Sequence, residues 1–237
     1  MNILLKCSIS FFDIIDKFIH QRKILNFFLK NKIKINYFMD VGSHKGLYTD
    51  LFIKNFKVKK ALLFEPQPEI FKYIKKKYAK NKRVKAFNFA VSNINSIKNL
   101  NLNHHDLTTT LSEFNKDSFY LWLKARLFGV KKMNYKKIKT KTIKLENILR
   151  TNNLKCVDLL KIDTEGHEFE VLSGLGKKIK KVNYILIEFH NDFIYQKYYP
   201  KKIHNYLIKN NFSLKTKFKF PFTTWEDRIY LNKNDFE

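Results

Sequence analysis

Residues 37–46 read YFMDVGSHKG and open a strand–turn–helix unit. The apolar first half is long enough for one buried strand, which reaches a carboxylate at Asp40 and breaks at Gly42. Gly46 follows, and from Leu47 onward apolar residues recur at helical spacing, so a helix is expected there. Gly42 permits a sharp turn and the close approach of a ligand to the backbone. The start of the helix offers unpaired N–H groups to an anion. This order predicts the first turn of a nucleotide-binding α/β unit.

A second short strand distinguishes this prediction from a purely structural glycine turn. Residues 61–64 read ALLF and are followed by Glu65 and Pro66. Glu65 lies 65 − 40 = 25 residues after Asp40, close to the roughly 20-residue spacing at which an acidic residue meets the ribose of a bound nucleotide. A carboxylate suits this task because it accepts hydrogen bonds from both vicinal hydroxyls.

The composition is strongly basic, with 47 Lys and Arg against 21 Asp and Glu and a net charge of +26. Such a charge favours nucleic acid, anionic lipid or acidic substrates as partners. The lysines are spread along the chain, which is also what a coding bias toward Lys, Asn and Ile produces. Cys7 and Cys156 form neither a metal-ligand spacing nor a disulfide framework, so a cytoplasmic location is expected.

The N-terminal segment, residues 1–35, is expected to be separate from a domain spanning residues 36–237. Residues 2–30 carry an apolar stripe at helical spacing. This helix either covers the sheet or the mouth of the site, or makes a peripheral contact with the inner membrane face. No secretory signal or membrane span is expected, because apolar runs stay short of the ~20 residues a span needs.

The rest of the chain alternates strands and helices. Further strands are expected at residues 84–92, 97–102, 156–163, 184–190, 212–218 and 228–232, and helices at residues 68–78, 119–128, 169–175 and 202–211. This alternation implies a parallel sheet covered on both faces. His104 and His105 have no third ligand at a recognisable spacing, so a loop or substrate-facing role is favoured over metal binding.

Five blocks of sequence, taken in order, resemble the FkbM-type methyltransferases. They are DVGSHKG at 40–46, FEP at 64–66, AVS at 90–92, LKIDTEGHE at 160–168 and IEFH at 187–190. The resemblance covers residues 36–232, and His44 stands where the family usually has Asn. It implies an α/β, Rossmann-like class I methyltransferase fold, whose mostly parallel seven-stranded sheet has an antiparallel last strand and helices on both faces. It also implies S-adenosyl-L-methionine as methyl donor.

The same resemblance implies where the donor lies. Its methionine part is expected against the turn of Val41, Gly42, Ser43, His44 and Gly46, with Asp40 beneath. Glu65 is expected at the ribose hydroxyls, with Pro66 beside it as a further donor-binding residue. Residues 88–92, Ala90 among them, are expected to flank the adenine, and Asp163 is expected at the amino group or the reacting centre. No metal ligand set is predicted, although carboxylates and histidine at one strand end leave metal dependence open.

Methylation of a hydroxyl requires the loss of a proton, which a general base accelerates by roughly 10²–10⁴-fold. The candidates at the strand ends are Asp163, Glu165, His167 and His190, of which Asp163, His167 and His190 are predicted to be catalytic. A histidine needs the least perturbation near neutral pH, so His167 or His190 is the expected base. The alternative is that both histidines orient substrate or cap a turn. The expected acceptor is a hydroxyl of a sugar, a glycan or a small metabolite.

Two charged groups have expected structural roles. Lys161, inside an apolar strand, is expected to be buried and paired with Glu188 or Asp163. Either Glu165 or Glu168 is expected to cap the helix that follows them.

Three other classes of protein are alternatives to a methyltransferase that acts on hydroxyl groups. A nicotinamide-dependent oxidoreductase would need glycine at position 44. An amino-group methyltransferase of nucleic acid would carry an Asn/Asp-Pro-Pro-aromatic block where DTEG stands at 163–166. A basic RNA-binding protein would bind RNA with steep salt dependence and would not bind the donor. No specific nucleic-acid partner is expected.

Overall fold

A computed structural model describes residues 19–102, 109–115, 118, 136–191, 194–221 and 223–236. The predicted features at residues 2–18, the pair His104 and His105, and the helix expected at 119–128 lie outside the described residues.

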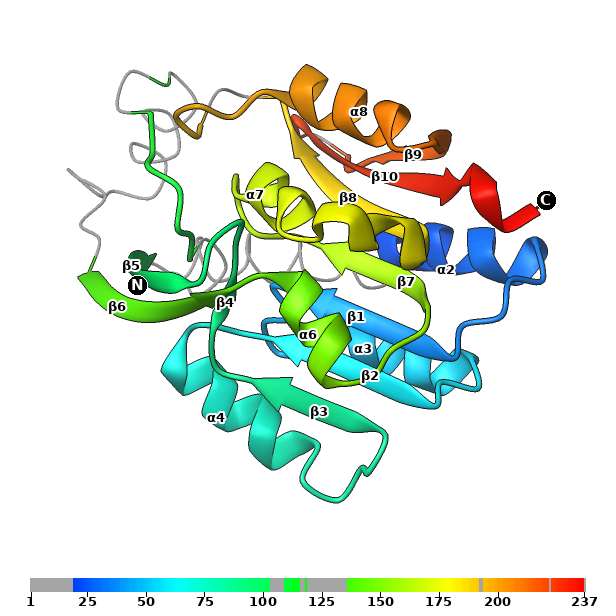
Figure 1. Ribbon diagram of the computed structural model, residues 1–237, viewed down its shortest axis with the longest axis horizontal. Coiled ribbons are helices and arrows are strands. Elements are labelled where there is room, and N and C mark those ends of the chain that lie inside the picture. The colour runs from blue at the N-terminus through cyan, green and yellow to red at the C-terminus, as the bar shows by residue number, and fades with distance from the viewer. Residues whose placement is uncertain are drawn as a thin grey trace.

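The central element is a seven-stranded sheet with the strand order β3-β2-β1-β7-β8-β10-β9 (Figure 1). Its strands are β1 (Tyr37–Val41), β2 (Lys60–Phe64), β3 (Val84–Phe87), β7 (Val157–Ile162), β8 (Val182–His190), β9 (Phe212–Lys219) and β10 (Trp225–Asn232). All neighbours from β3 to β8 pair in parallel, and β10 is antiparallel to both β8 and β9. The expected class I methyltransferase sheet, with its single reversed strand near one edge, is confirmed.

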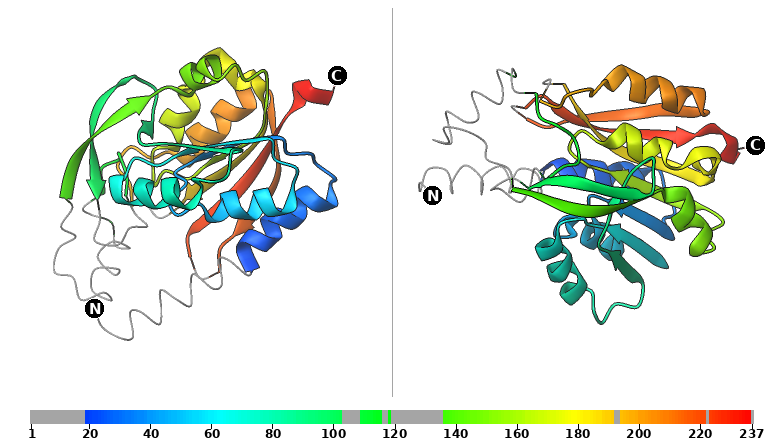
Figure 2. Two further views of the ribbon diagram at one scale, coloured as in Figure 1. Left: turned by 90° about the horizontal axis from the view of Figure 1, so that it is seen from below. Right: turned by 60° about the vertical axis from the view of Figure 1, so that its left-hand side comes forward.

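Alternate residues of each strand enter two separate cores, as the two-residue period of a strand requires. On β1, Phe38 packs into the core under α2, α3 and α4, whereas Met39 and Val41 pack into the core under α6, α7 and α8. The helices are α2 (Gln21–Lys30), α3 (Leu47–Asn55), α4 (Pro68–Lys77), α6 (Leu145–Thr151), α7 (Glu168–Ser173) and α8 (Pro200–Lys209), with 3-10 helices η3 (Gly176–Lys181) and η4 (Lys233–Phe236). Figure 2 shows the two helix layers on opposite sides of the sheet.

The described part of the N-terminal helix covers the sheet. Ile24 and Phe28 of α2 are fully buried in the same core as Phe38 and Phe52. A membrane contact of the N-terminal segment stays a prediction. Among the residues that the structure describes, no helix has both the length and the apolar character that crossing a bilayer requires.

A small three-stranded sheet corrects one sequence prediction. The single strand expected over residues 84–92 is wrong: β3 ends at Phe87 in the main sheet, and β4 (Ala90–Val91) joins β5 (Ser96–Leu102) and β6 (Lys136–Ile143). The chain leaves the main sheet at Asn88, whose side-chain amide donates to the carbonyls of Glu65 and Pro66 at 3.0 and 3.2 Å. These two hydrogen bonds take the place of the backbone hydrogen bonds that a longer β3 would make with this segment.

The last strand is longer than expected. Residues 225–227, predicted to separate two strands, belong to β10, where Glu226 and Asp227 pair with Phe189 and Glu188 of β8. Their carboxylates are compatible with a buried strand because each has a partner: Arg228 Nη2 lies 2.6 Å from Glu226, and His20 Nε2 lies 2.7 Å from Asp227.

Candidate active site

The glycine turn is tied to the end of the neighbouring strand β2. The N–H groups of Gly42 and Ser43 both donate to the carbonyl of Phe64, at 3.0 and 3.2 Å. Gly42 has a φ of +76°, and a Cβ there would lie 1.7 Å from the carbonyl oxygen of Asp163. Position 42 therefore requires glycine for two reasons: the positive φ of the turn and the close approach of the Asp163 main chain just after β7. The second reason is a packing constraint that the sequence did not reveal.

Glu65 holds the turn from the other side. Its carboxylate accepts the N–H of His44 at 2.9 Å and the N–H of Gln67 at 2.8 Å. Burial raises the pKa of Glu65 to about 7, although both hydrogen bonds favour the ionised form. Each carboxylate oxygen keeps a second lone pair, so Glu65 can still accept hydrogen bonds from the hydroxyls of a ligand.

Asp40 and Lys161 form a buried pair of charges beneath the turn. Asp40 is fully buried and accepts the hydroxyl of Thr49, on α3, at 2.7 Å. Lys161 is 3% exposed, and its Nζ lies 3.0 Å from Asp163 and 3.8 Å from Asp40. The prediction that Lys161 is buried and paired is confirmed, with Asp163 as its nearer partner. Asp40 thus supports the turn from below.

Asp163 follows β7 directly, and its main chain is hydrogen-bonded to the end of β1, next to the glycine turn. Its N–H donates to the carbonyl of Val41 at 3.0 Å, and its side chain remains 32% exposed. Burial raises the pKa of Asp163, but the charge and hydrogen bond of Lys161, together with Glu188 and His190, hold it below its ordinary value. The glycine turn, Glu65 and Asp163 therefore converge where β1, β2 and β7 end, the carboxyl edge of the sheet.

Two further residues expected to bind the donor, Pro66 and Ala90, lie on different elements. Pro66 is half-buried immediately after Glu65, and its carbonyl is held by Asn88. Ala90 is the first residue of β4 and is 5% exposed.

The two candidate histidines have opposite surroundings. His167 is buried, with Nε2 3.0 Å from the hydroxyl of Ser92, and burial together with the charge of Lys98 lowers its pKa to about 3. Burial also lowers the pKa of His190, but the carboxylates of Glu188 and Glu165 outweigh it and raise the pKa to about 10. At neutral pH His167 is thus an enclosed neutral imidazole, and His190 carries a positive charge.

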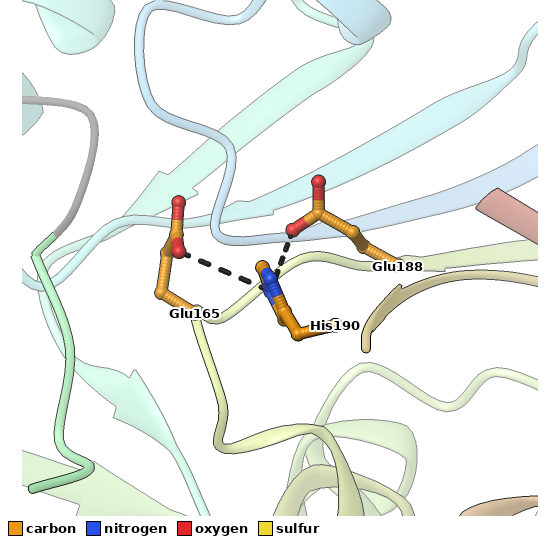
Figure 3. A group of neighbouring side chains, drawn as sticks. All are labelled: Glu165, Glu188 and His190. Carbon is orange, nitrogen blue, oxygen red and sulfur yellow. Dashed lines mark ion pairs between the residues drawn. The ribbon is translucent and has the colours of Figure 1, made fainter. Parts of the chain in front are cut away.

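His190 is the centre of a cluster that sequence reasoning did not assemble. Figure 3 shows Glu165, from the turn after β7, and Glu188, from β8, converging on it. The Nε2 atom of His190 lies 3.0 Å from Glu188 Oε2 and 3.9 Å from Glu165 Oε2. The sequence showed acidic residues at the ends of two strands. It did not show that their side chains converge, because the direction of Glu165 depends on the turn after β7.

That turn is fixed by Glu168. One oxygen of Glu168 accepts the N–H of Thr164 at 3.0 Å, the hydroxyl of Thr164 at 3.1 Å and the N–H of Gly166 at 3.1 Å. The prediction that Glu165 or Glu168 caps the following helix is wrong, because α7 has no side-chain capping hydrogen bond at its N-terminus and Glu168 instead binds the turn that precedes it. Glu165 then takes a φ of +55°, which is unfavourable for a residue with a Cβ and is characteristic of functional sites.

The carboxyl edge is acidic in a chain that is otherwise strongly basic. In the described part of the chain, two cationic side chains, Lys161 and His190, lie near six carboxyl groups. These are Asp40, Glu65, Asp163, Glu165, Glu168 and Glu188. Burial raises the pKa of Asp40, Glu65, Glu168 and Glu188, and a cationic ligand at this edge would favour their ionised forms.

Fold and site together define a class I methyltransferase: a seven-stranded sheet with one reversed strand and a glycine turn beside acidic strand ends. The particular family follows from a match to the methyltransferase FkbM domain over residues 40–214. The chain belongs to this family.

Known proteins show partial similarity. The hexuronic acid methyltransferase AglP of Haloferax volcanii is 34% identical over 50 residues, which is 21% of each chain, so the match spans about a fifth of that relative. Two solved structures share the fold. The putative tRNA (m1A22) methyltransferase Sp1610 of Streptococcus pneumoniae has a TM-score of 0.52 at 10% identity, covering 89% of this chain and 69% of the other. An SAM-dependent methyltransferase of Aquifex aeolicus has a TM-score of 0.50 at 13% identity, covering 92% and 93%.

Proposed function

We propose that this chain uses S-adenosyl-L-methionine to methylate a hydroxyl group of a sugar, a glycan or a small metabolite. The observation that carries the proposal is the position of Glu65, a buried carboxylate that binds the glycine turn and keeps free lone pairs at the carboxyl edge. Membership of the methyltransferase FkbM family supports the reaction type. The name of the related hexuronic acid methyltransferase supports a sugar as acceptor.

The residues at the edge fit this donor. The Ser43 hydroxyl in the turn is buried and has no hydrogen-bond partner within the described part of the chain, so it is available to a polar ligand. Glu65 would accept the ribose hydroxyls, with Pro66 beside it, and Ala90 would flank the adenine. The excess of carboxylates suits a donor with a positive sulfur and an ammonium group.

When bound, the donor supplies a methyl group on a cationic sulfur. The chain must align the acceptor oxygen with that carbon and remove its proton. Among the three predicted catalytic residues, Asp163 is ionised, one-third exposed and next to the turn, whereas His167 is enclosed and His190 is protonated. Asp163 would take the hydroxyl proton while the acceptor oxygen bonds to the methyl carbon and the carbon–sulfur bond breaks, its electron pair staying on the sulfur. Lys161 keeps the carboxylate ionised and oriented until then.

An acidic acceptor is supported by a basic hollow on the small sheet. Its volume is about 540 Å³, and Lys98, Lys137 and Lys139 line it together with one carboxylate, Glu113. The segment that closes the hollow reaches the site, because the hydroxyl of Thr110 donates to the carbonyl of Glu165 at 2.6 Å. A sugar carboxylate in the hollow would be held by lysines.

Titration calorimetry with S-adenosyl-L-methionine tests the donor. We expect one site in the wild type and at least tenfold weaker binding in Glu65→Gln. The matched control, Glu69→Gln, removes an exposed carboxylate on α4 and should bind normally. Absence of donor binding in the folded wild type would contradict the proposal.

A methyl-transfer screen tests the acceptor. It should compare acidic sugars, their neutral counterparts and RNA, because the net charge of +26 favours RNA as the second candidate acceptor. Transfer to an acidic sugar supports the proposal, and transfer to RNA alone overturns it.

A further inference from the structure

The side chains of Glu165, Glu188 and His190 form a cluster of possible metal ligands. Each offers one ligand atom, and these atoms all lie within 4.8 Å of one another. They come from two neighbouring segments, the turn after β7 and the end of β8, and all point to one position (Figure 3). Two carboxylates and one imidazole form a common ligand set for divalent metal ions.

The cluster contains buried polar atoms whose hydrogen-bonding capacity is unused. His190 is 5% exposed and Glu188 is 9% exposed. Across the described residues, neither His190 Nε2 nor Glu188 Oε2 has a hydrogen-bond partner, although the two atoms are 3.0 Å apart. Glu168 Oε2, on the same turn, is buried and unpartnered as well. Such atoms are costly to bury unless something else binds them.

The surroundings hold Glu165 toward this position. The hydroxyl of Tyr195 donates to Glu165 Oε2, and the Tyr195 ring packs against His190 with centroids 5.0 Å apart. A Cβ on Gly166 would come within 2.4 Å of the Tyr195 ring, so only glycine leaves room for that ring. Residues that orient ligands in this way are typical of built metal sites.

We propose that Glu165, Glu188 and His190 bind one divalent cation at the carboxyl edge of the sheet. On binding, the ion replaces the proton of His190, which is released to solvent, and it takes over from that proton the ion pair with Glu188. Carboxylate oxygens with one imidazole suit Mn²⁺ better than softer ions, which prefer thiolates. A catalytic use of the ion rests on the proposed function: it would bind the acceptor hydroxyl next to Asp163 and make its proton easier to remove.

Binding is tested with Mn²⁺ alone. The full-length protein is freed of metal with EDTA, dialysed and titrated with Mn²⁺, with electron paramagnetic resonance counting the bound ions. We expect one bound ion in the wild type and at least tenfold weaker binding in Glu188→Gln and His190→Gln. The control Glu170→Gln alters another carboxylate beside a histidine, 3.7 Å from His167, and should bind Mn²⁺ normally. A wild type that binds no ion, or variants that bind as it does, would overturn the proposal.

Thermal unfolding separates loss of the site from loss of the fold. Without metal, Glu188→Gln should melt below the wild type, because it removes the buried ion-pair partner of His190. With free Mn²⁺ at about 100 times its dissociation constant, the wild type should gain roughly 5–10 °C and the variant nothing. An equal gain in both proteins contradicts the assignment.

The donor must be examined separately, because its ammonium group is another source of positive charge. Donor binding measured in EDTA tests the proposed function without the metal. If the donor displaces Mn²⁺ competitively, the cluster belongs to the donor and the metal assignment is wrong. Independent binding of the two supports it.

Discussion

The pKa of Glu65 gives a quantitative prediction about stability. Burial raises this pKa from 4.5 to about 7 in the folded protein. Between these values the unfolded chain has lost the proton and the folded chain retains it, so the folded state binds more protons and stability falls as the pH rises. The contribution of Glu65 to stability is fully present below pH 4.5 and is lost as the pH rises through about 7. About 2.5 pKa units correspond to about 3 kcal/mol.

Glu65→Gln isolates this contribution, because other buried groups titrate in both proteins. The free energy of unfolding is measured by urea denaturation from pH 4 to pH 8 for the wild type, Glu65→Gln and the exposed-residue control Glu69→Gln. The advantage of wild type over Glu65→Gln should shrink by about 3 kcal/mol across this range. The difference between wild type and Glu69→Gln should stay within about 0.5 kcal/mol.

The same carboxylate should make donor binding depend on pH. If the ribose hydroxyls bind the ionised form, the affinity for S-adenosyl-L-methionine at pH 6 should be about tenfold weaker than above pH 8, given a folded-state pKa of about 7. A difference in stability that stays constant with pH, together with pH-independent donor binding, would refute the reasoning about Glu65.

Three further substitutions test the support of the site, each by urea denaturation. Lys161→Met leaves the buried Asp40 and the one-third-exposed Asp163 without their cation and should cost about 3–5 kcal/mol; a loss below 1 kcal/mol would show that Lys161 does not offset a buried charge. Gly42→Ala forces a Cβ to within 1.7 Å of a carbonyl oxygen, and it should destabilise by more than about 2 kcal/mol and reduce donor binding. Gly176→Ala, whose Cβ meets only the end of a flexible side chain, should cost clearly less, and equal costs would contradict the role of strand contact. Thr49→Val removes the donor to Asp40 and should cost about 1–3 kcal/mol, whereas no change would mean that another group replaces it.

Local sequence patterns predicted the elements that form the centre of the fold. The runs that became β1, β2, β7 and β8 are mostly apolar and end at polar residues, so their type and order were readable. Their ends placed Asp40, Glu65 and Asp163 at one edge, because parallel strands end together. The prediction that Lys161 pairs with a carboxylate followed from the cost of burying an isolated charge.

Features set by contacts distant in sequence were not predictable in this way. The division of residues 84–92 between two sheets depends on pairing with β6, more than 40 residues later in the chain. The direction of Glu165 depends on a backbone with positive φ that Glu168 and Tyr195 hold in place. The different protonation of His167 and His190 depends on which groups surround each imidazole after folding.

The contact between the Gly42 backbone and the Asp163 carbonyl has a mechanical consequence. Two main-chain segments in such contact have no soft side chain between them, so neither can shift without displacing the other. The distance between the glycine turn and the main chain of Asp163 is thereby fixed by backbone packing. Under the proposed function, any adaptation to a differently shaped acceptor would come from the small sheet, where Lys98, Lys137 and Lys139 line the hollow.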